Sequence, residues 1–164
     1  LIAAMNPCPC GYLGDPQREC TCTDGEIRRY GQKISGPLLD RIDLHVSVMR
    51  PKYSELTATI QGEPSCDIAK RVAEARAVQA ERLSRWHMQS NAQMGHRQLK
   101  ETCQLDAEGT EMLRVVFEKL HLSARSYDRI IKVARTIADL VGSDQIRPEH
   151  VAEAISFRNM INGK

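Results

Sequence analysis

The chain has 164 residues, a formal net charge of +2, 41% hydrophobic residues and only 4% aromatic residues. This length allows one medium domain or two small ones, and the charge is too small to argue for nucleic-acid binding from bulk electrostatics. With so few aromatic rings, aliphatic residues must fill the core, which favours packed helices. No run of 18 apolar residues is present, so neither a membrane-spanning helix nor a membrane partner is expected.

The first residues predict a buried strand and show no secretion signal. Residues 1–5 (LIAAM) form a short apolar run that ends at Asn6-Pro7, and no basic residues precede it. We therefore expect a cytoplasmic protein. Because the chain opens on an apolar strand and not on Met, we also expect it to be part of a longer protein.

Four cysteines form two C-x-C pairs separated by nine residues: Cys8, Cys10, Cys20 and Cys22. Four thiolates can close a tetrahedral zinc site, and disulfides are rare in the cytosol. In an extended chain alternate side chains lie ~6–7 Å apart, too far to share one metal ion, so turns at Pro9 and Thr21 are needed. Structural zinc is favoured, and free reduced thiols and disulfides remain alternatives.

The rest of this region predicts a short helix, a further helical turn and a strand. Residues 26–34 favour a helix weakened by Gly31, and Pro37 suits the first position of another. Over residues 42–48 apolar and polar residues alternate, which is typical of a half-buried strand. Residues 51–64 show no clear period and are interpreted as a linker.

A bundle of about four helices is predicted after the linker. The first runs over 65–88, capped by its first residue, and a solvated surface explains its basic face better than DNA contact does. Asp106 is expected to cap the next long helix. The clearest helix begins at Ser123 and stops at Gly142, and the last begins near Pro148.

The sequence lacks the two motifs that hold phosphates and Mg²⁺ in P-loop ATPases. It contains no G-x-x-x-x-G-K-[ST] loop (Walker A) and no apolar strand ending in Asp-Glu (Walker B). This chain alone is therefore expected not to hydrolyse ATP.

Three segments, in this order along the chain, resemble one family. LIAAMNPCPCG is similar to the sensor-1 strand of Mg-chelatase-like AAA+ ATPases, and ISGPLLDRIDLHV to their arginine-finger segment. LSARSYDRIIKVARTIADL, followed by IRPEHVAEAISFR, resembles their C-terminal helical lid. The match covers nearly the whole chain, and the four-cysteine loop narrows it to the bacterial ComM/YifB-type branch.

The resemblance implies a fold that is α/β plus all-α. Residues 1–50 correspond to the C-terminal piece of an AAA+ α/β core, with the sensor-1 and arginine-finger strands and the four-cysteine loop. Residues 51–64 are the linker. Residues 65–164 correspond to a helical lid bundle of the Mg-chelatase C-terminal type.

The resemblance also implies residues of an ATP site that missing upstream residues and a neighbouring subunit complete. Asn6 corresponds to sensor 1, Arg41 to an arginine finger that reaches a neighbour's γ-phosphate, and Arg125 to sensor 2. From the residues alone, simpler interpretations stay open: a turn at Asn6, a local ion pair of Arg41 with a nearby Asp, and an exposed helix arginine at Arg125. Arg129, one turn further along, is an alternative sensor 2.

The implied parent protein is a hexameric AAA+ ATPase and DNA helicase that acts in branch migration and recombination during natural transformation. Its cofactors are ATP with Mg²⁺ and, at the four cysteines, structural Zn²⁺. Its partners are identical subunits, as a homohexamer, and DNA. The alternative is a zinc-containing helical module that binds protein or nucleic acid and has no ATPase activity.

Overall fold

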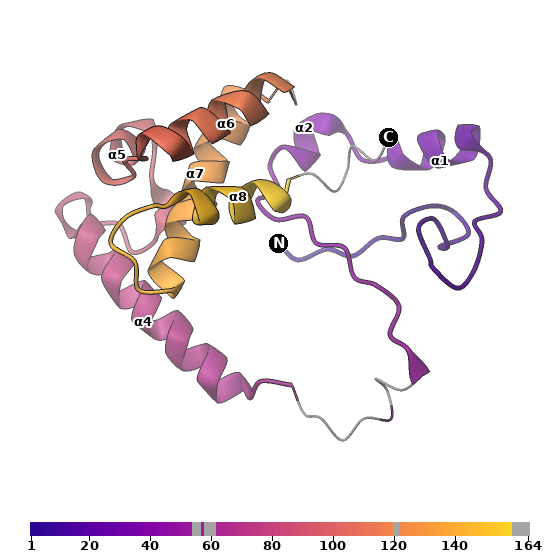
Figure 1. Cartoon of the computed structure of the whole chain (residues 1–164), viewed down its shortest axis with the longest axis horizontal. Helices are drawn as coiled ribbons and strands as arrows, with labels where there is room; N and C mark the ends of the chain where they lie inside the picture. Colours follow the sequence, from indigo (N-terminus) through magenta and orange to yellow (C-terminus); the bar gives the residue numbers. More distant parts are fainter. Residues whose placement is uncertain (54–56, 58–61, 120–121, 159–164) are drawn as a thin grey trace. The chain divides into compact units, whose positions relative to one another are not determined.

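The structure is a computed structural model that describes residues 1–53, 57, 62–119 and 122–158 (Figure 1). Contacts divide the chain into two compact units. The first unit comprises Leu1–Ile42 and Ser47–Ala58, and the helical unit comprises Asp43–Val46 and Thr59–Lys164. The two units are described separately below.

The first unit contains two short helices, α1 (Asp24–Gly31) and α2 (Gly36–Leu39), joined by irregular chain. Thr23 caps α1, because its hydroxyl accepts from the Glu26 N–H while the Glu26 carboxylate accepts from the Thr23 N–H at 2.8 Å. Proline stands in the first turn of α2, as predicted. Both predicted helices are confirmed, although α1 ends before residue 34.

Neither predicted strand forms among the described residues. Residues 1–5 and 42–48 contain no strand, and the one isolated bridge described joins Leu105 to Ile146 in the helical unit. The expected burial is absent too, since Val48 is 88% exposed. A strand is stable when neighbouring strands pair with it and cover its apolar face, and the described chain supplies no such neighbour. Neither strand prediction is therefore confirmed in the described chain.

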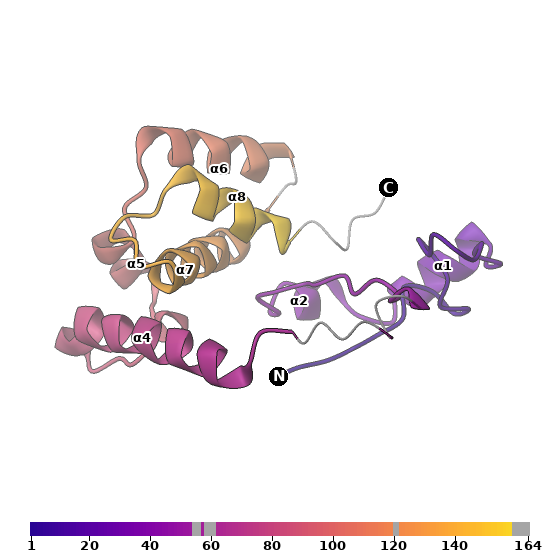
Figure 2. The ribbon, with the colours of Figure 1, turned by 60° about the horizontal axis from the view of Figure 1, so that its bottom comes forward.

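The helical unit confirms the predicted bundle. Its helices and 3₁₀ turns are α4 (Ser65–Leu83), η1 (Ser84–Trp86), η2 (Asn91–Gln93), α5 (His96–Thr102), α6 (Ala107–Lys119), α7 (Ala124–Leu140) and α8 (Pro148–Ser156). Helix α7 is central, since it contacts α4, α5, η2 and α8, while α6 packs on α8 (Figure 2). None of the helices in the described part of the chain combines the length and apolar character that a bilayer crossing requires.

The core of the helical unit explains why these segments are helices. Apolar side chains three and four residues apart form buried stripes on α7 and α8, and buried side chains of α4, α5 and α6 complete the core. The fully or nearly fully buried ones include Leu83, Leu113, Ile130, Ala134, Val151 and Ala154. The aliphatic core that the composition predicts is therefore present.

Local signals set the ends of these helices. The Ser123 hydroxyl accepts from the Ser126 N–H at 3.1 Å at the start of α7, and Gly142 follows its end with a φ of +68°. Asp106 caps α6 by accepting from the Gly109 N–H at 2.7 Å. The predicted cap of α4 is wrong, because Ser65 is already helical and the N-cap residue has no side-chain cap bond.

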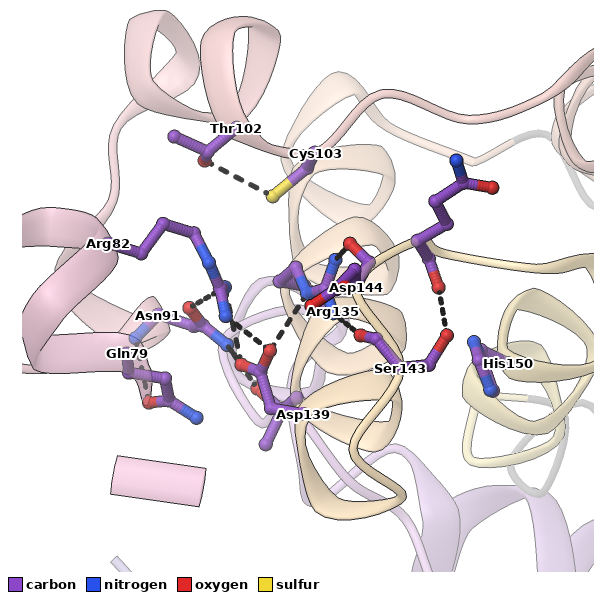
Figure 3. A network of polar contacts seen from close by, with 12 residues as sticks. Gln79, Arg82, Asn91, Thr102, Cys103, Arg135, Asp139, Ser143, Asp144 and His150 are labelled. Atoms are coloured by element: carbon purple, nitrogen blue, oxygen red, sulfur yellow. Dashed lines mark hydrogen bonds and ion pairs between the residues drawn. The ribbon is translucent and has the colours of Figure 1, made fainter. Parts of the chain in front are cut away.

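A buried polar network joins α4, η2 and α7 (Figure 3). The Asp139 carboxylate accepts from Arg135 Nε at 3.0 Å, from Asn91 Nδ2 at 2.8 Å, and from the guanidinium of Arg82. Arg135 also donates to the carbonyl oxygen of Asp144 at 2.8 Å, in the α7–α8 connection. These side chains satisfy one another's hydrogen bonds, so charged groups are held inside a mainly aliphatic bundle.

Candidate functional site

The four clustered cysteines come together in the first unit. Cys8 Sγ lies 3.4 Å from Cys10 Sγ and 3.7 Å from Cys20 Sγ, and the Cys10 and Cys20 sulfurs are 3.6 Å apart. With Cys22 included, all four sulfurs lie within 4.8 Å of one another. A tetrahedral zinc ion with Zn–S bonds of ~2.3 Å requires sulfurs ~3.8 Å apart, so the cluster has the dimensions of a structural zinc site.

A glycine-dependent turn builds half of this cluster. The Gly11 N–H donates to the Cys8 carbonyl at 3.1 Å, and Gly11 has a φ of +83°, a conformation that glycine adopts at little cost. The predicted turn at Pro9 is confirmed. No turn is present at Thr21, so the second predicted turn is wrong.

The thiols of the cluster differ in pKa. Backbone N–H groups of Tyr12 and Thr21 lower the pKa of Cys10 to about 5. A hydrogen bond with the Cys10 backbone lowers the pKa of Cys22. Desolvation and the neighbouring thiols outweigh this bond and raise the pKa of Cys22 to about 12. One thiolate therefore suppresses ionisation of a thiol beside it, and a divalent cation would relieve this repulsion.

The first unit also holds two of the predicted ATP-site residues, both exposed. A Cβ placed on Gly11 would lie 3.8 Å from Asn6 Nδ2, so the turn of the cysteine cluster packs against the Asn6 amide. Arg41 follows α2, and its Nη1 donates to the carbonyl oxygen of Pro37 at 2.7 Å. Asp43, a candidate local partner of Arg41, accepts a hydrogen bond from Arg129 of the helical unit.

The third predicted residue, Arg125, lies at a cavity of about 660 Å³ in the helical unit. Three cations of α7 line it at i, i+4 and i+7 spacing: Arg125, Arg129 and Lys132. Lys132 donates to the Ala92 carbonyl at 3.2 Å, and Arg129 binds Asp43. Within the part of the chain that the structure describes, Arg125 has no hydrogen-bond or ion-pair partner. Its guanidinium is therefore available to an anion.

Sequence reasoning missed two features of this cavity. Lys132 was not singled out, although its spacing from Arg125 places both on one helix face. Asp43–Val46 was assigned to a strand of the first region, yet its contacts are with the helical unit. Contacts between residues so far apart in sequence leave no local signal.

Comparison with known families places this geometry in context. Residues 1–56 match the family described as magnesium chelatase, subunit ChlI, and residues 62–158 match magnesium chelatase, subunit ChlI C-terminal. The chain belongs to the magnesium-chelatase-like family. The resemblance drawn from its three motifs is thereby confirmed, and the helical unit contains the segment that matches the C-terminal family.

Curated relatives narrow the family further. The chain is 39% identical to competence protein ComM of Haemophilus influenzae over 98% of this chain and 31% of ComM. It is 39% identical to YifB of Escherichia coli over 96% of this chain and 30% of YifB. It is 37% identical to the uncharacterized protein Rv2897c of Mycobacterium tuberculosis, with 31% of that protein covered. The chain thus spans about 30% of the length of the curated relatives it matches.

Proposed function

We propose that this chain is the C-terminal part of a hexameric AAA+ ATPase that remodels DNA. In this proposal Asn6 is sensor 1, Arg41 is the arginine finger and Arg125 is sensor 2. The ATP-binding site is completed by upstream residues that hold the phosphates and Mg²⁺ and by a neighbouring subunit. The single observation that carries the proposal is an exposed, unpaired Arg125 at a cavity of the described helical unit of a magnesium-chelatase-like chain.

The surroundings of Arg125 support an anionic ligand. An arginine in the first turn of a helix gains nothing from the helix dipole, so this position does not serve the stability of α7. Lys132 adds positive charge along the same face, while Arg129 is paired with Asp43, and Asp128 and Glu153 line other parts of the cavity. Phosphate oxygens match a guanidinium in charge and geometry, which makes nucleotide the ligand that fits best.

Exposed apolar residues of the first unit support a longer parent. Ile2 is 100% exposed and Val48 is 88% exposed, in sequences typical of strands. We propose that residues 1–5 join the sheet of an AAA+ core whose other strands lie outside this chain. Asn6 would then stand at the end of a strand, where ligands of open α/β sheets bind.

The cysteine cluster is proposed to hold one structural Zn²⁺ through Cys8, Cys10, Cys20 and Cys22. The ion would stabilise the turn that packs against Asn6 and so hold the proposed sensor-1 amide in place. The same cluster is the observation that favours the second candidate, a zinc-containing helical module that binds protein or nucleic acid. For either function we propose a cytoplasmic location.

The DNA-remodelling part of the proposal rests on the relatives. ComM of Haemophilus influenzae carries the name competence protein. We propose that the parent of this chain acts in natural transformation, as a homohexameric helicase in branch migration and recombination. Its DNA contacts are expected outside this chain, since the small net charge of +2 provides no strong electrostatic attraction.

Arg41→Ala in the full-length protein tests this proposal. DNA-stimulated ATP hydrolysis is expected to fall on the order of 10³-fold, because an arginine finger stabilises charge that develops in the transition state. Nucleotide binding is expected to change little, because that contact is weak in the ground state. The measurements are steady-state hydrolysis and binding of a fluorescent nucleotide.

Mixing subunits supplies the control. Arg41→Ala subunits mixed with subunits defective in their own Walker A loop should regain part of the activity, since some interfaces then pair an intact finger with an intact loop. A folded Arg41→Ala protein that hydrolyses ATP at the wild-type rate would refute the finger assignment and favour the binding module.

A further inference from the structure

The segment Asp43–Val46, which we call the strap, is attached to the helical unit although its chain neighbours on both sides belong to the first unit. Arg129 of α7 donates from Nη1 to Asp43 Oδ1. The next residue, Leu44, lines the cavity beside Arg125. An ion pair and an apolar side chain thus fix the first half of the strap to α7.

A backbone hydrogen bond fixes the second half. The His45 N–H donates to the carbonyl oxygen of Phe157, which follows α8, at 2.9 Å. The strap is therefore attached to two helices, and its position depends on where α7 and α8 lie. Sequence alternation over 42–48 misses this attachment because it depends on contacts across more than 80 residues.

The strap lies close in sequence to Arg41, the proposed arginine finger, and lines the same cavity as Arg125, the proposed sensor 2. Arg41 precedes Asp43 by two residues, so their Cα atoms lie at most about 7 Å apart. Arg125 precedes Arg129 by one helical turn on the same face of α7, and both line the same cavity. A contact between Asp43 and Arg129 therefore limits how far the two proposed nucleotide-binding arginines can move independently.

We propose that Asp43 is a positioning residue whose ion pair with Arg129 ties the arginine-finger segment to the sensor-2 helix. This inference rests on the proposed function. The pair is only partly buried, with side-chain exposures of 23% for Arg129 and 57% for Asp43. A pair of this kind is modest in strength and screened by salt, which suits a contact that opens and re-forms as nucleotide is turned over.

Neutralising either partner in the full-length protein tests the coupling. Asp43→Asn and Arg129→Gln should each lower kcat for ATP hydrolysis about tenfold, because a misplaced catalytic group loses rate even when substrate still binds. The KM for ATP should stay within about twofold, since the contact acts through position. The double variant should lose less than the sum of the two single losses, because the two side chains share a contact.

Two further measurements separate positioning from general damage. The exchanged pair, Asp43→Arg with Arg129→Asp, should regain most of the lost rate. Amide hydrogen exchange over residues 44–46 should accelerate about tenfold in Asp43→Asn, because the strap that holds the His45 N–H is loosened. Glu111→Gln is the control: its pair with Arg114 lies on α6 and is more exposed, at 60% for Glu111 and 54% for Arg114, so neither readout should change.

The outcomes distinguish the two proposals. If Arg41→Ala and Arg125→Ala lose hydrolysis while Asp43→Asn and Arg129→Gln keep it, the strap has no positioning role and the proposed function stands. Additive losses in the double variant would also overturn the coupling, since the residues would then act separately. If Arg41→Ala itself keeps full activity, the proposed function fails and the positioning role fails with it.

Discussion

Different interactions stabilise each of the two units internally. In the helical unit, aliphatic side chains from five helices are buried around α7, and a charged network is enclosed among them. In the first unit, Cys8 is the one buried residue among those that the structure describes. Turns, helix caps and the cysteine cluster hold its chain in place.

The difference shows which unit carries its own stability. Burial of apolar surface is the main favourable term in folding, and the helical unit contains that term in full. The first unit exposes Ile2 and Val48, which a folded domain would cover. The proposed ion at its cysteines and the proposed further sheet would both stabilise this unit, whereas the helical unit already has a buried apolar core.

Metal removal should produce the largest effect, and it should affect the first unit but not the helical unit. Protein purified without chelator should contain about one zinc per chain, because ligation supplies on the order of 10–16 kcal/mol to sites of this kind. A strong chelator should greatly accelerate amide exchange over residues 8–22 and leave α7 unchanged. The measurements are elemental analysis and hydrogen exchange on the full-length protein.

Single cysteine variants provide the matched comparison. Cys20→Ser removes one of the four clustered sulfurs and should abolish stoichiometric zinc, whereas Cys66→Ser changes an exposed thiol outside the cluster and should retain it. Reduced, folded protein with less than a tenth of an equivalent of metal would support the free-thiol alternative.

Asp139→Asn should produce the next largest effect, and in the helical unit alone. The substitution keeps the shape of the side chain but leaves Arg82 and Arg135 without their shared carboxylate, in a buried setting. Losing one partner of a buried ionic network costs about 3–5 kcal/mol. Exchange of the most protected α7 amides should accelerate accordingly, while residues 8–22 keep their protection.

Glu111→Gln again serves as the control for that measurement. Its ion pair with Arg114 is more than half exposed on both sides, and pairs of this kind contribute about 0–1 kcal/mol. Equal effects of the two substitutions would mean that the network around Asp139 does not hold α4 to α7.

Sequence predicted the helices well because their signals are local. Ser123, Asp106 and Gly142 mark helix ends through bonds to residues three or four positions away, and the apolar spacing identifies the buried face. The four cysteines were found for the same reason. The arrangement of Asp139 with Arg82, and of Asp43 with Arg129, joins distant segments and left no periodic signal. The strands failed because a strand depends on partners that local sequence cannot supply.

Of the predicted site residues, the structure places Arg125 where an anion could reach it and packs Asn6 against the cysteine turn. Their roles came from family resemblance and stay proposals, as does that of Arg41. Spacing alone could not have assigned them, because an exposed arginine and an Asn-Pro turn are common surface features.

The smallest predicted effects come from removing the hydroxyl N-cap of one helix in each unit. Ser123→Ala removes the acceptor for the Ser126 N–H, which should cost about 1 kcal/mol. Because α7 has eight buried residues, this loss should appear throughout the helical unit as reduced protection. Thr23→Ala removes the corresponding bond to the Glu26 N–H, but α1 has no buried residues, so only α1 should fray.

Glu26 reports on the α1 cap directly. The Thr23 N–H, and then the Thr23 hydroxyl, lower the pKa of the Glu26 carboxyl. A lowered pKa in the folded state means that the cap stabilises α1 above the ordinary glutamate pKa and loses this contribution as the pH falls through the lowered value. Thr23→Ala should therefore raise the pKa of Glu26 only part of the way, since the backbone donor remains, and Thr23→Ser should leave it unchanged. An NMR titration of Glu26 in the three proteins measures this. If Thr23→Ala instead lowered protection across the helical unit, the cap would not act on α1 alone, contrary to what the lack of buried residues in α1 predicts.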